Sequence, residues 1–303
     1  MKIGLISTIM AGTEDIDSFL NHYRQIGFSH LYIIFDGIDP RFSLGTTKTQ
    51  DCTVLNGPSL EEYRTIDTDL PRDPGLVSQS VLLRQILNFH LAIRIAAHDG
   101  IEWVMHVDSD EQLVSTIAID SVLARAGDSC GQLWVRNSEI YLESDWKRSF
   151  GSMVSFKNNP HFIHPEILAE YFKVTGKRFF FSAYTIGKSF VRVEAFKKAA
   201  CVHRNGLKSG YFGTWADDSL LLLHFCHTEW ESFQKKFNRL KSEKQKHWDD
   251  SQVLDFYREG AEKARAGAES LRRFFEETLI HNESDAEILR NLGIVSNPYE
   301  CRI

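Results

Sequence analysis

The sequence predicts an α/β fold with a Rossmann-like, mostly parallel central sheet flanked by helices and a helical extension at the C-terminus. Three observations support this prediction. Short apolar runs alternate with helical patterns in the first half of the chain, mixed strand patterns follow residue 130, and charged helical patterns follow residue 228. With 303 residues the chain suits one large domain with an appendage.

The first part of the chain alternates strand and helix signals. Ile3 to Ile9 is apolar and β-branched like a strand, and Asp15 to Gly27 has the acidic start and glycine stop of a helix. Leu31 to Phe35 is a second strand ending in the turn signal Asp36-Gly37, and Cys52 to Leu55 is a candidate third. This alternation predicts parallel strands joined by helices.

A long helix and a further strand come next. Ser78 to His98 is predicted as one helix whose buried stripe repeats every four residues, at Leu83, Leu87, Leu91 and Ile95. Trp103 to Val107 (WVMHV) then reads as a strand running into Asp108. We expect its carboxyl end to lie at the same edge of the sheet as the ends of the earlier strands.

The second half of the chain mixes strand and helix patterns. Strands are predicted at Gln132 to Arg136, Ser152 to Phe156, Ile186 to Val193 and Ala200 to His203, and Ser219 to Phe225 is short and apolar. Helix is predicted from Glu229 to about His281 and again near Asp285 to Asn291. We therefore expect one domain over residues 1–228 and a helical extension over residues 229–303.

Composition excludes several classes of protein. A net charge of −6 argues against broad adhesion to nucleic acid. The five cysteines contain no C-x-x-C pair, which makes a zinc cage or redox dithiol improbable and favours reduced core thiols. No apolar stretch approaches the ~20 residues that span a bilayer, and Met1 to Ala11 reads as a strand rather than a signal peptide. We expect a cytoplasmic protein or one peripheral on a membrane face.

The most informative segment is Trp103 to Leu113, WVMHVDSDEQL. Its strand delivers Asp108 and Asp110 at the carboxyl end, with Glu111 directly behind. Three acids in four residues repel one another unless a cation lies among them, and such oxygen ligands suit Mg²⁺ or Mn²⁺ completed by substrate phosphates. The segment therefore predicts a metal-diphosphate site. The alternative is that D-S-D starts a turn and caps a helix near Thr116.

Four motifs in order resemble one enzyme group. They are RQILNFHLAIRIAAHDGIEWVMHVDSDEQL from Arg84, HYRQIGFSHLYIIF from His22, GKSFVR from Gly187 with His203 downstream, and LHFCHTEWESFQKKF from Leu223. Together they resemble the glycosyltransferase family-2-like group with the GT-A fold, and within it the branch of the family-92 (DUF23-type) enzymes with a D-x-D-E motif. Two departures are the absent N-x-E after the first strand and Gln112 after the acids.

The resemblance implies a hexosyl- or pentosyltransferase. It would move a sugar from a nucleotide-diphosphate donor to a glycan or other hydroxyl acceptor, with Mn²⁺ or Mg²⁺ as cofactor. A UDP-linked donor is the favoured prediction. Residues 1–113 would form the nucleotide-sugar half of the catalytic domain and residues 114–228 the acceptor half. The cation would stabilise the leaving diphosphate as a Lewis acid, and a carboxylate would deprotonate the acceptor in an inverting reaction.

The resemblance also assigns roles to the donor side. Asp36 would contact the base, Asp108 would be shared between metal and ribose, and Asp110 would be the direct metal ligand. Further donor contacts would come from Arg84, Asn88 and Lys188. A histidine, His203 or His224 with His227 competing, would complete the metal shell. The structural alternatives are a turn at Asp36, solvated surface positions for Arg84, Asn88 and Lys188, and buried, hydrogen-bonded histidines.

The base assignment rests on the pair Asp217-Asp218 in TWADDSL. Asp217 is preferred to Asp218, and adjacent acids are expected to raise one of the two pKa values. The alternative is a capping role, and Glu139 and Glu166 also remain open as bases. Aromatic side chains that could stack on an acceptor sugar, or form core, are Trp134, Tyr141, Trp146, Tyr211, Phe212 and Trp215.

A basic run begins the C-terminal extension, relieved only by Glu243, at Lys235, Lys236, Arg239, Lys241, Lys244 and Lys246. It could touch an anionic membrane surface or acceptor, although a solvated helix face is the simpler reading. The sequence leaves the oligomeric state open. Two other functions are considered: a nucleotide-sugar-binding relative without turnover, and a phosphatase or phosphotransferase with Asp108 as nucleophile, whose motif would need Thr or Val at Gln112.

Overall fold

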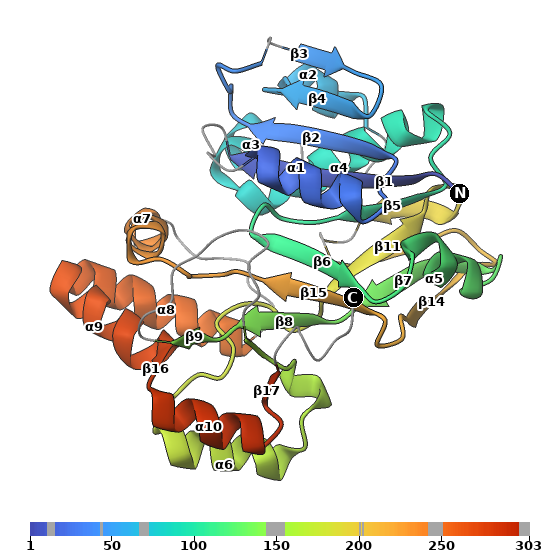
Figure 1. Ribbon diagram of the computed structural model, residues 1–303. Helices are drawn as coiled ribbons and strands as arrows, with labels where there is room; N and C mark the ends of the chain where they lie inside the picture. The colour runs from blue at the N-terminus through green and yellow to red at the C-terminus, as the bar shows by residue number, and fades with distance from the viewer. Residues whose placement is uncertain are drawn as a thin grey trace. The chain divides into compact units, whose positions relative to one another are not determined.

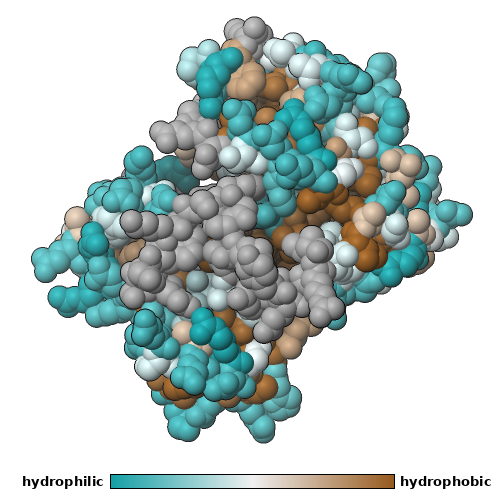
Figure 2. Space-filling view, in the orientation of Figure 1, coloured by the Kyte–Doolittle hydropathy of each residue, from teal (hydrophilic) through white to brown (hydrophobic). Residues whose placement is uncertain are grey.

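The structure is a computed structural model in which residues 1–10, 16–42, 45–66, 73–143, 155–199, 201, 203–241 and 251–296 are described. The chain forms two compact units: residues 1–136 with 187–222, and residues 137–186 with 223–303. The expected functional division near residue 228 stays a prediction. On the face shown in Figure 2 hydrophilic side chains predominate, with hydrophobic ones gathered in smaller patches.

The first unit is built on an eight-stranded sheet of order β14-β7-β11-β5-β1-β2-β4-β3 (Figure 1). Four of its seven pairings are parallel (β1 with β2 and β5, β2 with β4, β7 with β14), and β3–β4, β5–β11 and β7–β11 are antiparallel. The bounds are β1 Ile3–Met10, β2 His30–Asp36, β3 Gly45–Lys48, β4 Cys52–Asn56, β5 Trp103–His106, β7 Cys130–Val135, β11 Lys188–Arg192 and β14 Phe212–Trp215. The mixed α/β class is confirmed.

The remaining elements of this unit are short apart from two helices. They are α1 Ile16–Gln25, α2 Leu60–Arg64, α3 Pro74–Gln79, α4 Val81–His98, β6 Glu111–Ser115, α5 Ile119–Arg125, a 3₁₀ turn Val193–Ala195, β12 Phe196–Ala199 and β13 Asn205–Leu207. The helix expected over 78–98 is divided at Ser80. The backbone of Ser80 is extended, and its side chain accepts from the Leu83 amide at 3.2 Å to begin α4.

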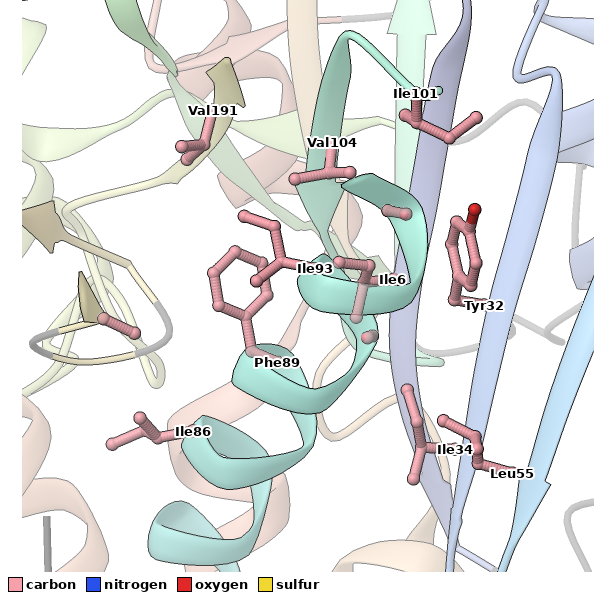
Figure 3. Packing of buried hydrophobic residues seen from close by; sticks show 13 residues of the cluster. Ile6, Tyr32, Ile34, Leu55, Ile86, Phe89, Ile93, Ile101, Val104 and Val191 are labelled. Carbon is pink, nitrogen blue, oxygen red and sulfur yellow. The ribbon is translucent and has the colours of Figure 1, made fainter. Parts of the chain in front are cut away.

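Helix α4 packs on one face of this sheet (Figure 3). Its Ile86, Phe89 and Ile93 meet Ile6 of β1 and Val104 of β5 in one buried cluster. The row predicted to be buried contributes Leu83 and Leu87, whereas Leu91 and Ile95 are only partly buried. A strict i+4 row drifts around a helix of 3.6 residues per turn, so the core face follows mixed steps of three and four.

Helix α1 packs on the opposite face. Val191 of β11 points into the α4 cluster, so its neighbour Phe190 points the other way. There Phe190 stacks on Phe28 at 6.0 Å between ring centroids, and Phe28 meets Tyr23 of α1 edge-on at 5.3 Å. The sheet is therefore covered on both faces at β1, β5 and β11.

The second unit combines short strands with helices. It contains β8 Asn137–Ile140, β9 Leu142–Glu143, β10 Phe156–Lys157, a 3₁₀ turn Pro160–Phe162, α6 Pro165–Thr175, α7 Trp230–Leu240, α8 Ser251–Ala266, α9 Ala268–Leu279, β16 Ile280–His281, α10 Glu283–Asn291 and β17 Val295–Ser296. Strands order as β17-β10-β8-β15, and β15 (Leu220–His224) crosses the division between the units. The expected helical stretch 229–281 is thus several helices, with residues 242–250 outside the described part.

The described cysteines and helices agree with two expectations from the sequence, namely core thiols and no apolar stretch long enough to span a bilayer. Cys52, Cys130 and Cys226 are buried and form no disulfide, as expected for core thiols, and Cys201 is half-buried and also forms none. Cys301 lies outside the described residues. Across the described ranges every helix is too short or too polar to cross a bilayer.

Gly187 fixes the start of β11. Its φ is +67°, a left-handed conformation that favours glycine, and a Cβ there would lie 2.1 Å from the carbonyl oxygen of Val135. Lys188, the next residue, pairs with Val135 in register. The backbone at Gly187 therefore determines where the Lys188 side chain enters the sheet.

We predict that Gly187→Ala lowers the free energy of unfolding by more than 2 kcal/mol, because backbone strain of about 1–2 kcal/mol adds to the clash with Val135. Urea unfolding measures the change. Gly210→Ala is the matched control, since its φ is +92° with no atom within 4 Å of the added Cβ. Equal losses in the two variants would show that the close approach at Gly187 is unimportant.

Candidate functional site

The carboxyl ends of β1, β2 and β5 lie at one edge of the first unit's sheet. From β1 the chain moves outward to β2 and β4 on one side, and then through α4 to β5 on the other side of β1. Such a reversal is the switch point at which open α/β sheets bind ligands. Asp36 is the last residue of β2, and Asp108 follows the end of β5 by two residues. Two predicted site residues therefore lie at this edge.

The Asp108 carboxylate is held on both oxygens. Gln85 of α4 donates to Oδ1 at 3.0 Å, and the Lys188 ammonium donates to Oδ2 at 2.7 Å. The Asp108 side chain is 26% exposed, whereas that of Lys188 is fully buried. Asp108 is thus presented at the surface in a fixed orientation, with its negative charge compensated from within the sheet.

Glu111 forms a second layer behind Asp108. Its Oε2 accepts from the Asp108 backbone amide at 2.7 Å and lies 3.6 Å from the Lys188 ammonium. Glu111 also begins β6, and α5 starts only at Ile119, after Ala118, which has no capping side chain. The reading of D-S-D as a helix cap is therefore wrong.

Charge and burial act against each other at these groups. Burial alone would raise the pKa of Asp108, but the Lys188 ammonium more than offsets it and holds that pKa below its usual value. Burial alone would lower the pKa of Lys188, but Asp108 and then Glu111 raise it above its usual value. The two groups are accordingly an ionised pair at neutral pH.

Two neutral histidines lie near this pair. Burial, followed by the charge of Lys188, lowers the pKa of both His106 and His203 to about 3. His203 Nδ1 lies 2.8 Å from the Gly187 carbonyl oxygen, so it supports the turn before Lys188. Neither ring nitrogen of His106 has a hydrogen-bond partner among the described residues. Their neutrality leaves Lys188 as the cation in contact with Asp108.

Helix α1 holds the backbone after the acids. The buried Tyr23 hydroxyl donates to the Glu111 carbonyl at 3.1 Å and accepts from the Leu113 amide at 3.2 Å. His22 Nε2 lies 2.8 Å from the Leu113 carbonyl oxygen. These two side chains fix the first residues of β6, directly after Asp108 and Asp110. Neither side chain was predicted to contribute to the site, although both occur in the HYRQIGF motif.

Asp36 and Arg84 form a second, two-pronged ion pair at the same edge. Arg84 Nε and Nη2 donate to the two Asp36 oxygens at 2.5 and 2.9 Å. Its remaining nitrogen, Nη1, donates to the carbonyls of Val77 and Ser78. The side chains are 20% and 16% exposed for Arg84 and Asp36. Asp36 thus has a more specific role than a turn former, and contact with a nucleotide base stays a prediction.

Asn88 has a buried structural position. It is fully buried; its Oδ1 accepts from the Tyr63 hydroxyl at 2.7 Å and its Nδ2 donates to Thr8 Oγ1 at 3.2 Å. It therefore links α4 to α2 and β1. The solvated-face alternative is wrong for Asn88, and its predicted contact with the diphosphate is not favoured by this arrangement.

The Asp108 carboxylate as arranged does not fit a divalent cation. Asp108 already has an ammonium on one oxygen and an amide on the other. Among the described residues no group of three or more His, Cys, Asp or Glu side chains is placed to hold a metal ion. Asp110 is half-buried. The manganese assignment and the ligand roles of Asp108 and Asp110 stay predictions of the sequence.

Of the three histidines proposed for the metal shell, His203 lies in the first unit, and His224 and His227 lie in the second. His224 ends β15, and its ring lies 5.1 Å from that of Tyr184. His227 contacts Tyr257 through Nε2 at 3.2 Å and is packed among Phe233, Phe237 and Phe256. It is also the one described non-glycine residue with a positive φ, +56°. This aromatic enclosure favours a structural role for His227, and metal binding by His224 stays a prediction.

The proposed bases are both exposed and paired with arginines. Asp217 accepts from Ser219 and lies 3.0 Å from Arg125, and its side chain is 51% exposed. Asp218 accepts from Arg136 at 2.8 Å and is 89% exposed. The hydrogen bond from Ser219, which outweighs the small effect of burial, lowers the pKa of Asp217. The pKa of Asp217 is therefore not the one that an acidic neighbour would raise.

The other candidate bases differ in burial. Glu139 is 1% exposed, and its oxygens accept from the amides of Ser182 and Ala183 and lie 3.1 Å from Lys157. It is a buried structural acid. The side chain of Glu166 is 90% exposed at the start of α6, where a carboxylate suits the helix dipole.

The aromatic candidates divide between surface and core. Phe212 and Trp215 on the edge strand β14 are 52% and 44% exposed, and Trp215 lies 5.9 Å from Trp134 between ring centroids. Tyr141 is buried in the second unit and Tyr211 is half-buried. Trp146 lies outside the described residues. Among the described candidates, Phe212 and Trp215 are therefore the most exposed for stacking on an acceptor.

The basic run is partly described. Lys236 donates to the Tyr257 hydroxyl at 2.9 Å and lies over its ring, and Lys241 donates to Asn238 at 3.0 Å. Lys244 and Lys246 lie outside the described residues. Since Lys236 is engaged within the unit, membrane contact through this helix stays a prediction.

We predict that Tyr23→Phe lowers the free energy of unfolding by about 1–3 kcal/mol, because the Glu111 carbonyl and Leu113 amide lose a buried partner. Chemical unfolding monitored by circular dichroism checks this. Tyr211→Phe is the control, since Tyr211 is half-buried and its hydroxyl can be replaced by water. A Tyr23→Phe variant as stable as the wild type would contradict the positioning role.

The chain has low sequence similarity to known proteins. No family model matches the chain. Two glycosyltransferase-like proteins of Arabidopsis thaliana are each 22% identical to it, over 261 and 219 residues that cover 78% and 67% of this chain and 56% and 43% of theirs. The chain thus spans about half the length of these curated relatives.

A crystal structure of residues 1–349 of S. aureus TarS is also similar, with a TM-score of 0.34 and 11% identity over 85% of this chain and 70% of that one. At that TM-score the likeness carries no argument about fold. The α/β assignment therefore rests on the strand order and packing described above.

Proposed function

We propose that this chain is a glycosyltransferase of the GT-A class that moves a sugar from a UDP-linked donor to a glycan or other hydroxyl acceptor. The observation that supports this most is the pair of fixed acids, Asp36 and Asp108, at the carboxyl edge of β2 and β5 on either side of β1. The weak similarity to glycosyltransferase-like proteins points the same way.

The donor would lie along this edge. Arg84 orients the Asp36 carboxylate, which would accept hydrogen bonds from the base or the ribose. Gln85 and Lys188 orient the Asp108 carboxylate, which would accept from a neighbouring part of the donor. Because the negative charge of both acids is already compensated, they suit a neutral ligand group that donates hydrogen bonds, such as a hydroxyl or an amide. Donor binding at this edge would need no metal ion, because the Lys188 ammonium already compensates the charge of Asp108.

In the acceptor step we keep Asp217 rather than Asp218 as the proposed base of an inverting reaction. Ser219 and Arg125 fix its carboxylate, and its lowered pKa keeps it deprotonated at neutral pH, as a base requires. The same lowering reduces its basicity, so an acceptor would have to displace Arg125 or exclude water to restore it. The exposed rings of Phe212 and Trp215 precede it on β14.

A second candidate is a nucleotide-sugar-binding relative without turnover. The tight pairing of Asp108 with Lys188 favours it, since that carboxylate is not free to act. The phosphatase alternative gains no support from the topology, because its acids would follow the first strand and here they follow β5.

We predict that a screen of UDP-sugars for nucleotide release identifies one donor whose turnover requires an added acceptor. Asp110 follows Asp108 at the same edge, and we propose that its carboxylate also accepts from the donor, so Asp110→Ala should lower that turnover at least a hundredfold. The fold should be retained, because Asp110 is half-buried at the edge rather than in the core. Asp120→Ala, on α5, is the control.

The outcomes of the screen are distinct. Unchanged turnover in Asp110→Ala would remove this residue from the site. Donor binding by calorimetry without nucleotide release for any sugar would favour the binding protein. Phosphate release without dependence on a nucleotide would favour the phosphatase.

A further inference from the structure

The buried ammonium of Lys188 lies where the acid motif places a cation. Lys188 is fully buried, and its Nζ is 2.7 Å from Asp108 and 3.6 Å from Glu111. Gly187 fixes its entry into β11, and its pairing with Val135 holds the backbone. The side chain is therefore committed to the two carboxylates rather than turned towards solvent.

The carboxylates are arranged to receive that ammonium. Gln85 orients the other oxygen of Asp108, and Glu111 is tied to the Asp108 amide, so both acids converge on Lys188. A buried ammonium without such partners would be strongly unfavourable. A divalent ion on Asp108 would have to approach this positive charge in a poorly solvated site, where like charges repel strongly.

We propose that Lys188 is the resident counter-ion of Asp108 and that its ammonium excludes a divalent cation from this carboxylate. It follows that the edge binds a nucleoside diphosphate without added metal. This second part rests on the proposed function, whereas the first concerns the protein alone. Lys188 is here a positioning residue, since it acts through Asp108.

The first test titrates Mn²⁺ alone into wild type, Asp108→Asn, Lys188→Met and the double variant, by calorimetry without nucleotide. Wild type and Asp108→Asn should bind Mn²⁺ equally weakly. Lys188→Met should bind it about tenfold tighter or more, because an ammonium is removed while both acids remain. The double variant should lose the gain, which assigns it to Asp108.

Two outcomes would overturn the counter-ion assignment. One is wild-type Mn²⁺ binding that Asp108→Asn weakens about tenfold or more. The other is a folded Lys188→Met variant that binds Mn²⁺ no tighter than wild type. If Lys188→Met fails to fold, the comparison of wild type with Asp108→Asn still tests whether Asp108 binds Mn²⁺, because both proteins keep Lys188.

The second test titrates UDP into wild type with EDTA and with Mn²⁺. Equal dissociation constants, within about twofold, are expected. Binding about tenfold tighter with Mn²⁺ would overturn metal independence. If UDP binds in neither condition, both the inferred nucleotide binding and the proposed function are overturned. The Mn²⁺ titration would still test whether Lys188 is the counter-ion of Asp108.

Discussion

The ion pair between Asp108 and Lys188 is the interaction on which the candidate site depends. It joins the segment that follows β5 to β11, the antiparallel neighbour of β5, and sets the charge at the switch point of the sheet. The local features around it serve its geometry: the left-handed Gly187, the His203 contact to that turn, Gln85 on α4 and Tyr23 on α1. Helix α4 therefore holds the Asp108 carboxylate directly, and α1 holds the backbone that follows it.

The second unit also contains a buried ion pair, but this pair has a structural role. There Glu139 pairs with Lys157 at 3.1 Å, and both side chains are almost fully buried, at 1% and 6% exposed. Backbone amides of Ser182 and Ala183 complete the shell of Glu139. Nothing is left for a ligand in that pair, so it is structural. Asp108 differs because part of its side chain reaches the surface at the carboxyl edge of parallel strands.

The sequence was sufficient for the fold class and for the position of the acids. Apolar runs and turn signals located β1, β2, β4 and β5, and the placement of Asp108 directly after β5 followed from them. These are local properties, set by residue type and spacing. The break at Ser80 was missed because the helical pattern continues across it, and only the extended backbone with its cap ends one helix and begins the next.

The contacts of the site could not be predicted in the same way. Asp108 and Lys188 are 80 residues apart, and no spacing rule shows that a lysine from β11 enters behind the acids. Lys188 was therefore assigned to donor phosphates and the acids to a metal. The lowered pKa of Asp217 likewise depends on Ser219 and Arg125, whose approach is set by the fold rather than by the adjacent Asp218.

A double-mutant cycle on the free energy of unfolding tests the central pair most directly. It compares wild type, Asp108→Asn, Lys188→Met and both changes together in urea. We expect a favourable coupling free energy of about 2 kcal/mol or more, because each single change leaves a buried or half-buried charge without its partner. Additive effects, with a coupling near zero, would show that the two charges do not stabilise each other and would contradict the account.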